Sequence, residues 1–294
     1  MQLTNKQNLP AAIVRAVSAD DHRGADYSTS MLSKSPRMVW LDRRHQAEIT
    51  EDVSERIWAL IGKACHYVVE KADAPNTLHE GYLEMQVLEK ILSGTFDLFD
   101  GKTLSDIKTV SVYQIKHGSA IPDWEKQVNT YAHLLRQIGF VPEAVEVIAI
   151  CRDWSKRTAQ REEDYPQAQV VLVPLRLWSA AEAQAHIEAR IGIFEEHSLT
   201  TDDALPDCTP FEMWEKPAVY AVMKVGRKSA VKLHDDKAAA DAHAATLGTG
   251  HSVTHRPGER VRCADYCRVA PFCSQHKKWL SENTSAGLGA GYEQ

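Results

Sequence analysis

Two nearly continuous apolar runs constrain the fold of this chain more than any other feature. They cover residues 144–151 (AVEVIAIC) and 169–178 (QVVLVPLRLW). Such runs are typical of strands covered on both faces of a sheet in layered α/β folds. An amphipathic helix is expected over 123–139, where apolar residues recur at helical spacing and a glycine ends the pattern. A closing helix is expected over 179–197.

The segment before these runs predicts further helices and a meander of strands. A helical pattern lies near 29–46, and an amphipathic helix is expected over 52–72. Residues 82–112 fit three strands joined by tight turns at Ser93-Gly94 and Asp100-Gly101. Residues 1–26 are polar and mixed and are interpreted as a loosely held lead-in. The chain therefore predicts an α/β core that ends near residue 200.

The composition changes beyond residue 200. Residues 200–217 have the proline and acidic content of a linker. A hairpin that turns at Val225-Gly226-Arg227 and a helix over 236–246 then predict a small α+β segment within 201–280. Residues 281–294 are small and polar and are predicted to be disordered.

The overall composition is that of an ordinary globular protein. The chain has 294 residues, with 34 Lys and Arg against 40 Asp and Glu, so its formal net charge is −6. These values exclude collagen-like and intrinsically disordered proteins. No apolar run approaches the roughly 20 residues that cross a bilayer, and the first residues lack the layout of a secretory signal. We therefore expect a cytoplasmic protein without a membrane partner.

Two aspartates and a lysine in the predicted meander carry the strongest chemical signal. Antiparallel strands that join near residue 100 bring Asp97 beside Asp106, and the two-residue strand period places Lys108 on the same face as Asp106. Clustered carboxylates ionise together when a cation neutralises them, and oxygen-rich sets suit Mg²⁺ or Mn²⁺. A lysine beside such a metal can orient or deprotonate a water and stabilise charge on a phosphate, which is the chemistry of phosphodiester hydrolysis. The alternative is an exposed cross-strand ion pair worth less than about 1 kcal/mol.

Two of the predicted helices add polar residues to this set. His66 lies beside the apolar stripe of the helix over 52–72, and Gly62 one turn earlier leaves room for it to face the same cleft. Gln127 and Tyr131 are four residues apart on the helix over 123–139 and share one face.

These motifs, in this order, resemble the PD-(D/E)XK nuclease superfamily. Within this superfamily they resemble the RecB-like exonucleases, which include the CRISPR-associated RecB-like enzymes and the phage recombination exonucleases. The resemblance covers residues 27–200 and is carried by GKACH at 62–66, GTFD at 94–97, DIK at 106–108 and QVNTY at 127–131. It implies a restriction-endonuclease-like core, in which helices flank a mixed β-sheet.

The resemblance also implies a role for each residue of the set. The implied metal ligands are His66, Asp97, Asp106 and the carbonyl of Ile107; the catalytic lysine is Lys108; Gln127 and Tyr131 hold the DNA strand or the active-site water. Glu80 and Glu84 are secondary candidates. The implied protein is a Mg²⁺- or Mn²⁺-dependent deoxyribonuclease, acting as an exonuclease on single-stranded DNA or duplex ends.

The implied setting is DNA recombination, repair or phage DNA processing in a bacterial or phage-infected host. Its implied partners are a recombinase, a single-strand annealing protein or a helicase. Two alternatives stay open: a catalytically weak nucleic-acid-binding accessory subunit, and an unrelated metal-stapled α/β protein whose D-x-K is accidental.

The cysteines predict a second metal site. In a cytosolic chain of this size, six cysteines indicate a metal rather than a disulfide scaffold. Cys263, Cys267 and Cys273 lie close together, and such thiolates can bind zinc or an iron–sulfur cluster. Cys208 is the expected fourth ligand. The alternatives to it are His251, His255 and His276, while Cys65 and Cys151 are expected to be core residues.

The resemblance favours a structural [4Fe–4S] cluster over Zn²⁺ at this second site. The nucleases resembled often carry one upstream cysteine and three near the C-terminus. This chain departs from that pattern, because residues 33–37, where the upstream cysteine is expected, contain none. Either metal would hold the C-terminal segment to the body of the protein and contribute to its folding free energy.

Basic residues gather in three places along the chain. They are Arg37, Arg43 and Arg44; Arg152, Lys156 and Arg157; and Lys224, Arg227 and Lys228. Such clusters neutralise DNA phosphates, and Trp154 is a candidate for stacking on a base. A solvated surface is the alternative for each cluster, and packing in the interior is the alternative for Trp154. No segment resembles a base-reading recognition helix, so little sequence specificity is expected.

Overall fold

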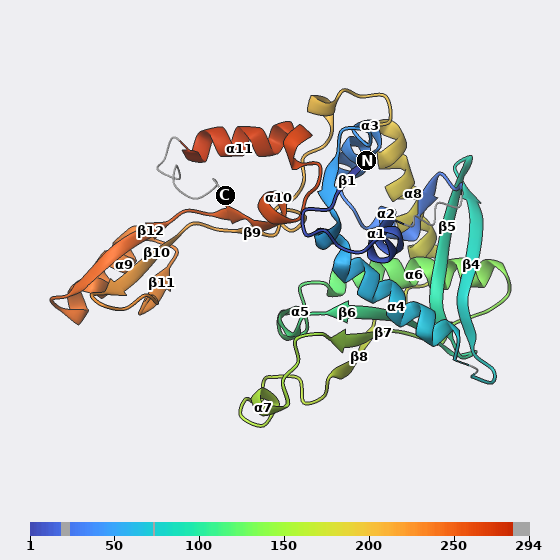
Figure 1. Ribbon diagram of the computed structural model, residues 1–294, viewed down its shortest axis with the longest axis horizontal. Helices are drawn as coiled ribbons and strands as arrows, with labels where there is room; N and C mark the ends of the chain where they lie inside the picture. Colours follow the sequence, from blue (N-terminus) through green and yellow to red (C-terminus); the bar gives the residue numbers. More distant parts are fainter. Residues whose placement is uncertain (19–23, 73, 285–294) are drawn as a thin grey trace. The chain divides into compact units, whose positions relative to one another are not determined.

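The computed structural model describes residues 1–18, 24–72 and 74–284 (Figure 1). The chain divides into two compact units, each of which is described by itself. The first unit comprises residues 1–34 and 50–198, and the second comprises 35–49 and 199–294. Residues 35–49, which the sequence analysis assigns to the predicted α/β core, therefore group with the C-terminal part of the chain.

The first unit is built from alternating helices and strands. In chain order they are β1 (Gln2–Thr4), α1 (Ala11–Ser18), β2 (Tyr27–Ser28), α2 (Thr29–Leu32), β3 (Thr50–Asp52), the 3-10 helix η1 (Val53–Arg56), α4 (Ile57–Glu70), β4 (Leu78–Val87), β5 (Lys90–Phe99), β6 (Thr103–Val110), α5 (Val112–His117), α6 (Ile121–Gln137), β7 (Ala144–Cys151), α7 (Lys156–Ala159), β8 (Val170–Leu175) and α8 (Ala180–Glu196). The predicted lead-in contains regular structure in its described residues, 1–18 and 24–26: α1 lies within it, and β1 pairs in parallel with β3.

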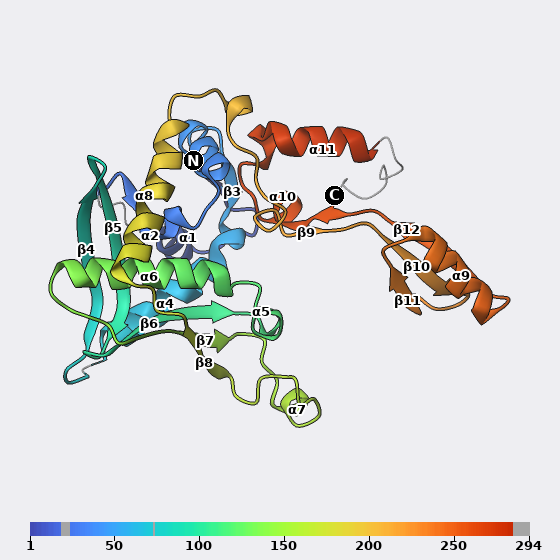
Figure 2. The same ribbon diagram turned by 180° about the vertical axis from the view of Figure 1, so that it is seen from behind.

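A six-stranded mixed sheet organises this unit. Its order is β2-β5-β6-β7-β8, and β4 pairs with β5. The β6–β7 pair is parallel, whereas β5–β6 and β7–β8 are antiparallel. α4 crosses one face near β6 and α6 runs along the opposite face (Figures 1 and 2). The fold is therefore a mixed α/β sheet flanked by helices, as the sequence predicts.

The main core fills the space between α6 and the sheet. Val128 and Leu135 of α6 are fully buried there together with Val147 and Ala149 of β7. β8 differs from the predicted strand with two covered faces. It is an edge strand whose outer side chains Leu172 and Val170 are exposed, because no described element covers that face. An apolar run alone does not tell a central strand from an edge strand.

Two details of the predicted meander and helices are wrong. The expected turn at Ser93-Gly94 lies inside β5, and the chain turns instead at Leu88-Glu89, where φ is 49° and 63°. Gly94 is needed for packing, since a Cβ there would lie 2.6 Å from Thr29 Cγ2 and 2.7 Å from Tyr131 Cε1. The expected helix over 52–72 divides into η1 and α4, and no residue of α4 is buried.

The second unit contains short helices and two small sheets, a three-stranded one of order β11-β10-β12 and a two-stranded one of β13 with β9. Its elements are α3 (Pro36–Arg44), the 3-10 helix η2 (Asp202–Ala204), β9 (Glu215–Lys216), β10 (Val219–Lys224), β11 (Lys232–His234), α9 (Lys237–Leu247), β12 (His251–Arg256), β13 (Glu259–Arg260), α10 (Val261–Asp265), the 3-10 helix η3 (Ala270–Phe272) and α11 (Ser274–Thr284). The predicted hairpin and helix are present, and β12 adds an unpredicted third strand to the hairpin.

Two further expectations concern the ends of elements. The pattern near 29–46 forms two helices, α2 and α3, in place of one. Of the predicted tail, residues 281–284 belong to α11 and residues 285–294 lie outside the described residues. Across the described part of the chain, no helix combines the length and apolarity needed to span a bilayer.

A half-buried histidine on α8 makes the stability of the first unit depend on pH. His186 packs edge to face against Trp178, with ring centroids 5.1 Å apart, and its Nε2 has no hydrogen-bond partner among the described residues. Burial lowers the pKa of His186 to about 4. Between pH 6.5 and 4 the unfolded chain therefore binds a proton that the folded chain does not, so stability falls as the pH falls.

We expect His186→Gln to reduce the loss of stability between about pH 7 and pH 5 by about 1 kcal/mol, a value discounted for partial exposure. The free energy of unfolding in urea measures it. His117→Gln, at an exposed position on α5, serves as the control. Identical pH dependence in the wild type and His186→Gln would contradict the interpretation.

Candidate functional site

A gap between β5 and β6 forms the centre of the candidate site. The two strands pair at Leu98 with Ser105 and at Phe99 with Leu104, and then separate. Asp97 fills the opening, where its Oδ2 accepts a hydrogen bond of 2.5 Å from the backbone N–H of Ile107. A carboxylate thus takes the place of a strand partner, and it is held in the sheet with 6% of its surface exposed.

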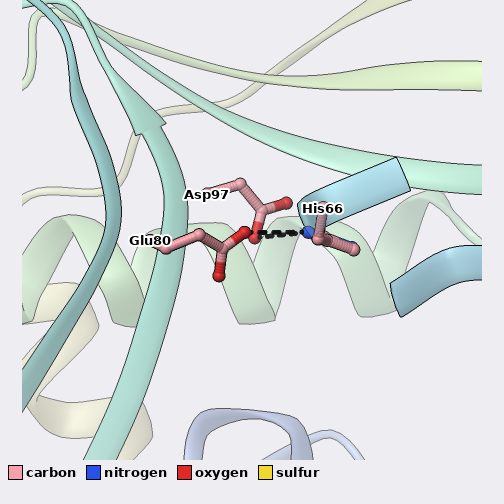
Figure 3. Close-up of side chains that lie close together, drawn as sticks. All are labelled: His66, Glu80 and Asp97. Atoms are coloured by element: carbon pink, nitrogen blue, oxygen red, sulfur yellow. Dashed lines mark hydrogen bonds and ion pairs between the residues drawn. The ribbon is translucent and has the colours of Figure 1, made fainter. Parts of the chain in front are cut away.

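Three metal-ligating side chains meet at this gap (Figure 3). His66 of α4 places Nδ1 3.2 Å from Oε1 of Glu80 and 3.3 Å from Oδ1 of Asp97. The potential ligand atoms of the three residues all lie within 4.8 Å of one another, which allows one cation to contact all of them. The hydrogen bond to Asp97, opposed by burial, raises the pKa of His66.

Glu80 reaches the site through a distortion of β4. Its backbone has φ of 47°, and the β4–β5 register passes from His79 to Gly81, which leaves Glu80 opposite Asp97. A left-handed non-glycine residue costs about 1–3 kcal/mol, and such strain gathers at functional sites. Burial and the charge of Asp97 raise the pKa of Glu80.

Asp106 and Lys108 form a pair on one face of β6, as the strand period predicts. Lys108 Nζ lies 2.8 Å from Asp106 Oδ2. Burial raises the pKa of Asp106, and the charge of Lys108 opposes this shift. Burial disfavours the charge on Lys108, but the attraction of Asp106 outweighs it and raises the pKa of Lys108. The lysine is therefore a fixed cation, and its partner is Asp106 rather than Asp97.

Tyr131 and Gln127 approach the same pair from α6. Gln127 Nε2 donates a hydrogen bond of 2.9 Å to Tyr131 Oη. Burial, followed by the charge of Asp106, raises the pKa of Tyr131, so its hydroxyl stays neutral. The close packing of Tyr131 on Gly94 fixes the ring beside the sheet.

The structure thus brings six of the residues predicted from the sequence to one region, together with Glu80, one of the two secondary candidates. They are His66, Asp97, Asp106, Lys108, Gln127 and Tyr131. Glu84 lies apart: it is exposed further along β4, where it accepts a hydrogen bond from Tyr82.

Ile107 donates its backbone N–H to Asp97, and the predicted role of its carbonyl as a metal ligand stays a prediction. The sequence signal for Glu80 is weak, because only the adjacent Gly81 hints at an irregular strand.

The four cysteines predicted to bind a metal line one cavity in the second unit. Cys208, Cys263, Cys267 and Cys273 contribute to its wall together with Arg37 and His276. The other two alternative ligands, His251 and His255, lie on β12 and are not among the residues that line this cavity. The lining therefore contains enough thiols for a four-cysteine site.

Arg37 supports the loop that carries Cys208. Its guanidinium donates to the carbonyl of Leu205 and, at 3.1 Å, to the carbonyl of Pro206, and it pairs with Asp207 at 3.1 Å. Arg37 is 2% exposed, so the prediction that it neutralises DNA phosphates is wrong.

Burial disfavours the thiolate form of two of these partly buried cysteines. Burial raises the pKa of Cys208 to about 11 and that of Cys263 to about 12. Metal binding at such a site displaces the thiol protons. Among the described residues, no three potential ligand atoms in this cavity lie within 4.8 Å of one another. Of the two cysteines expected in the core, Cys151 is fully buried and Cys65 is partly exposed on α4.

The other basic and aromatic candidates divide between surface and interior. Arg44 pairs with Asp202 at 2.8 Å, whereas Arg152 and the residues Lys156, Arg157, Lys224, Arg227 and Lys228 are exposed. Trp154 donates a hydrogen bond of 2.7 Å from Nε1 to the carbonyl of Pro166 and packs on the main core. The prediction that Trp154 stacks on a base is therefore wrong.

Searches with family models and among curated proteins give no match. Among solved structures, the crystal structure of SSO0001 has a TM-score of 0.44 and 16% identity, over 64% of this chain and 87% of that chain. An alkaline exonuclease (LHK-Exo) from Laribacter hongkongensis has a TM-score of 0.35 and 13% identity, over 58% of this chain and 88% of that chain. Both similarities are too distant to assign this chain to a family.

Proposed function

We propose that this chain is a metal-dependent deoxyribonuclease with a PD-(D/E)XK core. The observation that carries the proposal is the convergence of His66, Glu80 and Asp97 with a buried aspartate–lysine pair at one gap in the sheet. Metal ligands beside a fixed cation suit the hydrolysis of a phosphodiester, because negative charge builds on the phosphate during attack. Because the sequence motifs occur in the order found in RecB-like exonucleases, we further propose that the chain acts as an exonuclease on DNA ends.

The donor set fits a divalent cation. Carboxylates suit Mg²⁺ and Mn²⁺, and an imidazole favours Mn²⁺. His66, Glu80 and Asp97 would hold the ion, with Asp106 and the Ile107 carbonyl as further ligands. When bound, the cation supplies Lewis-acid stabilisation of the phosphate.

The protein groups around the metal ligands have separate tasks. Lys108, fixed 2.8 Å from Asp106, orients the attacking water and stabilises the negative charge that grows on the phosphate. The neutral hydroxyl of Tyr131, which Gln127 holds at 2.9 Å, positions the water or the strand by hydrogen bonding. His66, Asp97 and Glu80 orient one another before a metal arrives.

For the second unit, we propose a structural [4Fe–4S] cluster held by Cys208, Cys263, Cys267 and Cys273. In such a cluster each cysteine binds a different iron, and the four cysteines that line this cavity supply the required number of thiolates. The sequence resemblance favours the cluster, and a tetrahedral zinc ion on the same four thiolates is the alternative. The cluster would join the loop with Cys208 to the segment from Cys263 to Cys273.

The test uses end-labelled single-stranded and duplex DNA with Mg²⁺, Mn²⁺ or EDTA. We expect cleavage that requires the metal and stops with EDTA, and the product ladder gives the polarity. No cleavage of any DNA end by the folded, metal-replete protein would contradict the proposal. That result would favour the accessory-subunit alternative, in which a recombinase, an annealing protein or a helicase supplies the activity.

Removing the charge of Glu80 is expected to weaken metal binding. Glu80→Gln should raise the metal concentration for half-maximal cleavage by roughly 10- to 100-fold, as for other groups that support a metal site. Glu84→Gln is the matched control on the same strand, because it removes an exposed carboxylate outside the site. Metal titration of the cleavage rate distinguishes them, and equal curves for both variants would exclude Glu80 from the site.

A further inference from the structure

An exposed aromatic–cation pair lies at the start of α4. The side chain of Trp58 is among the large apolar groups left at the surface, with 56% of it exposed. The guanidinium carbon of Arg152 lies 4.6 Å from the centroid of its ring. Arg152 also donates a hydrogen bond of 3.4 Å to the carbonyl of Thr109, which fixes the guanidinium at the end of β7. The pair is therefore ordered and accessible.

The same rigid elements carry this pair and the candidate active site. Trp58 and His66 are eight residues apart on α4, about 12 Å along the helix axis. Thr109 directly follows Lys108 on β6 and packs beside Gly62 of α4, where a Cβ would lie 3.8 Å from Thr109 Oγ1. At about 3.4 Å per nucleotide of a stacked strand, the separation corresponds to three or four nucleotides.

The core does not account for this exposed indole. Trp154, two residues beyond Arg152, has a packing role, since its partly buried ring packs against the core and its indole N–H is hydrogen-bonded. Trp58 has neither feature: more than half of it faces solvent, and α4 has no buried residue. Among the described residues, Arg152 forms no ion pair, so its charge is available to a phosphate.

We propose that Trp58 and Arg152 bind single-stranded DNA a few nucleotides from the cleavage point. The indole stacks on one base, and the guanidinium contacts the neighbouring phosphate. The proposal rests on the nuclease function and adds two statements to it. The DNA strand reaches the active site in single-stranded form, and Trp58 and Arg152 bind it three or four nucleotides from the scissile phosphate.

The matched control lies on the same helix. Tyr67 is also exposed and also has a cation near its ring, Lys71 at 5.4 Å, but nine residues place it on the opposite side of α4 from Trp58. We expect Trp58→Ala to raise the Kd for an end-labelled oligothymidylate in EDTA by roughly 5- to 150-fold, and Trp58→Phe to retain most of the affinity. Tyr67→Ala should leave the Kd unchanged.

A strand with a single abasic site tests the position of the contact. Moving that site along the oligonucleotide should weaken cleavage by the wild type most when it lies three or four nucleotides from the scissile phosphate. Trp58→Ala should lose this position dependence, because it has no ring on which the base could stack. If the base instead contacts another part of the protein, the wild type and Trp58→Ala will show the same dependence of cleavage on the abasic position, which would contradict the proposal.

The outcomes separate this inference from the nuclease function. If the wild type cleaves DNA but Trp58→Ala matches it in Kd and in abasic profile, the nuclease stands and the stacking platform is overturned. That result would assign the exposed ring to a protein partner. If the wild type neither binds nor cleaves any DNA, both proposals fail. Thermal melts of Trp58→Ala and Trp58→Phe establish that each variant is folded.

Discussion

Lys108→Ala is expected to lower the rate of metal-dependent DNA cleavage by about 10²- to 10³-fold, the usual cost of removing one preorganised electrostatic group from an active site. The ammonium sits 2.8 Å from the buried carboxylate of Asp106, so water cannot replace it with equal geometry. The variant also leaves Asp106 buried without its cation, which favours the protonated acid and weakens that residue as a metal ligand. Single-turnover cleavage at saturating Mn²⁺ measures the chemical step apart from metal affinity.

Lys90→Ala is the matched control for this prediction. Lys90 lies on β5, is comparably exposed, and pairs with Glu195 at 3.0 Å, but it has no contact with the gap residues. Its removal should leave the rate nearly unchanged. Lys108→Arg keeps the positive charge and shows whether charge alone suffices. A rate for Lys108→Ala equal to that for Lys90→Ala would remove Lys108 from the mechanism.

Cys263→Ser is expected to deprive the second unit of its iron and to destabilise that unit by more than about 4 kcal/mol, since losing a structural metal removes its folding energy. The thiol is one of four that line the cavity, and burial already opposes its ionisation. Iron and sulfide content after anaerobic purification, together with proteolysis of the segment after residue 199, measures both effects.

Cys65→Ser controls for the loss of a thiol outside the cavity. Cys65 is a partly exposed free cysteine on α4, so its replacement should change neither iron content nor proteolysis. Wild-type protein with one zinc ion and no iron would contradict the cluster while retaining the four-cysteine site. Wild-type protein that binds neither metal would contradict the site itself.

Strong local periodicity explains what could be predicted from the sequence. The apolar run at 144–151 forms β7 over the same residues, and the helices expected at 123–139 and 179–197 form α6 and α8 within two residues. The D-x-K spacing placed Asp106 beside Lys108, because alternation along a strand depends on no distant contact.

Distant contacts explain what could not be predicted. Gly94 resembles a turn residue, but it lies in a strand because Thr29 and Tyr131 pack against it. Glu80 enters the site through a left-handed backbone that strand propensity disfavours. The grouping of residues 35–49 with the second unit depends on contacts such as Arg268 Nε with Asp42 Oδ1 at 2.6 Å, which join positions more than two hundred residues apart.

The opening between β5 and β6 indicates which residues related proteins would keep for structural reasons alone. Asp97 accepts a hydrogen bond from the N–H of Ile107, so a relative without the proposed nuclease activity would still need an acceptor there to complete its sheet. Lys108 does not complete the backbone hydrogen bonding of the sheet in this way, since its side chain forms an ion pair with Asp106. A relative with neutral residues at both 106 and 108, which leaves no unpaired buried charge, is therefore expected to lack the proposed nuclease activity. Retention of Asp97 alone would not indicate that activity.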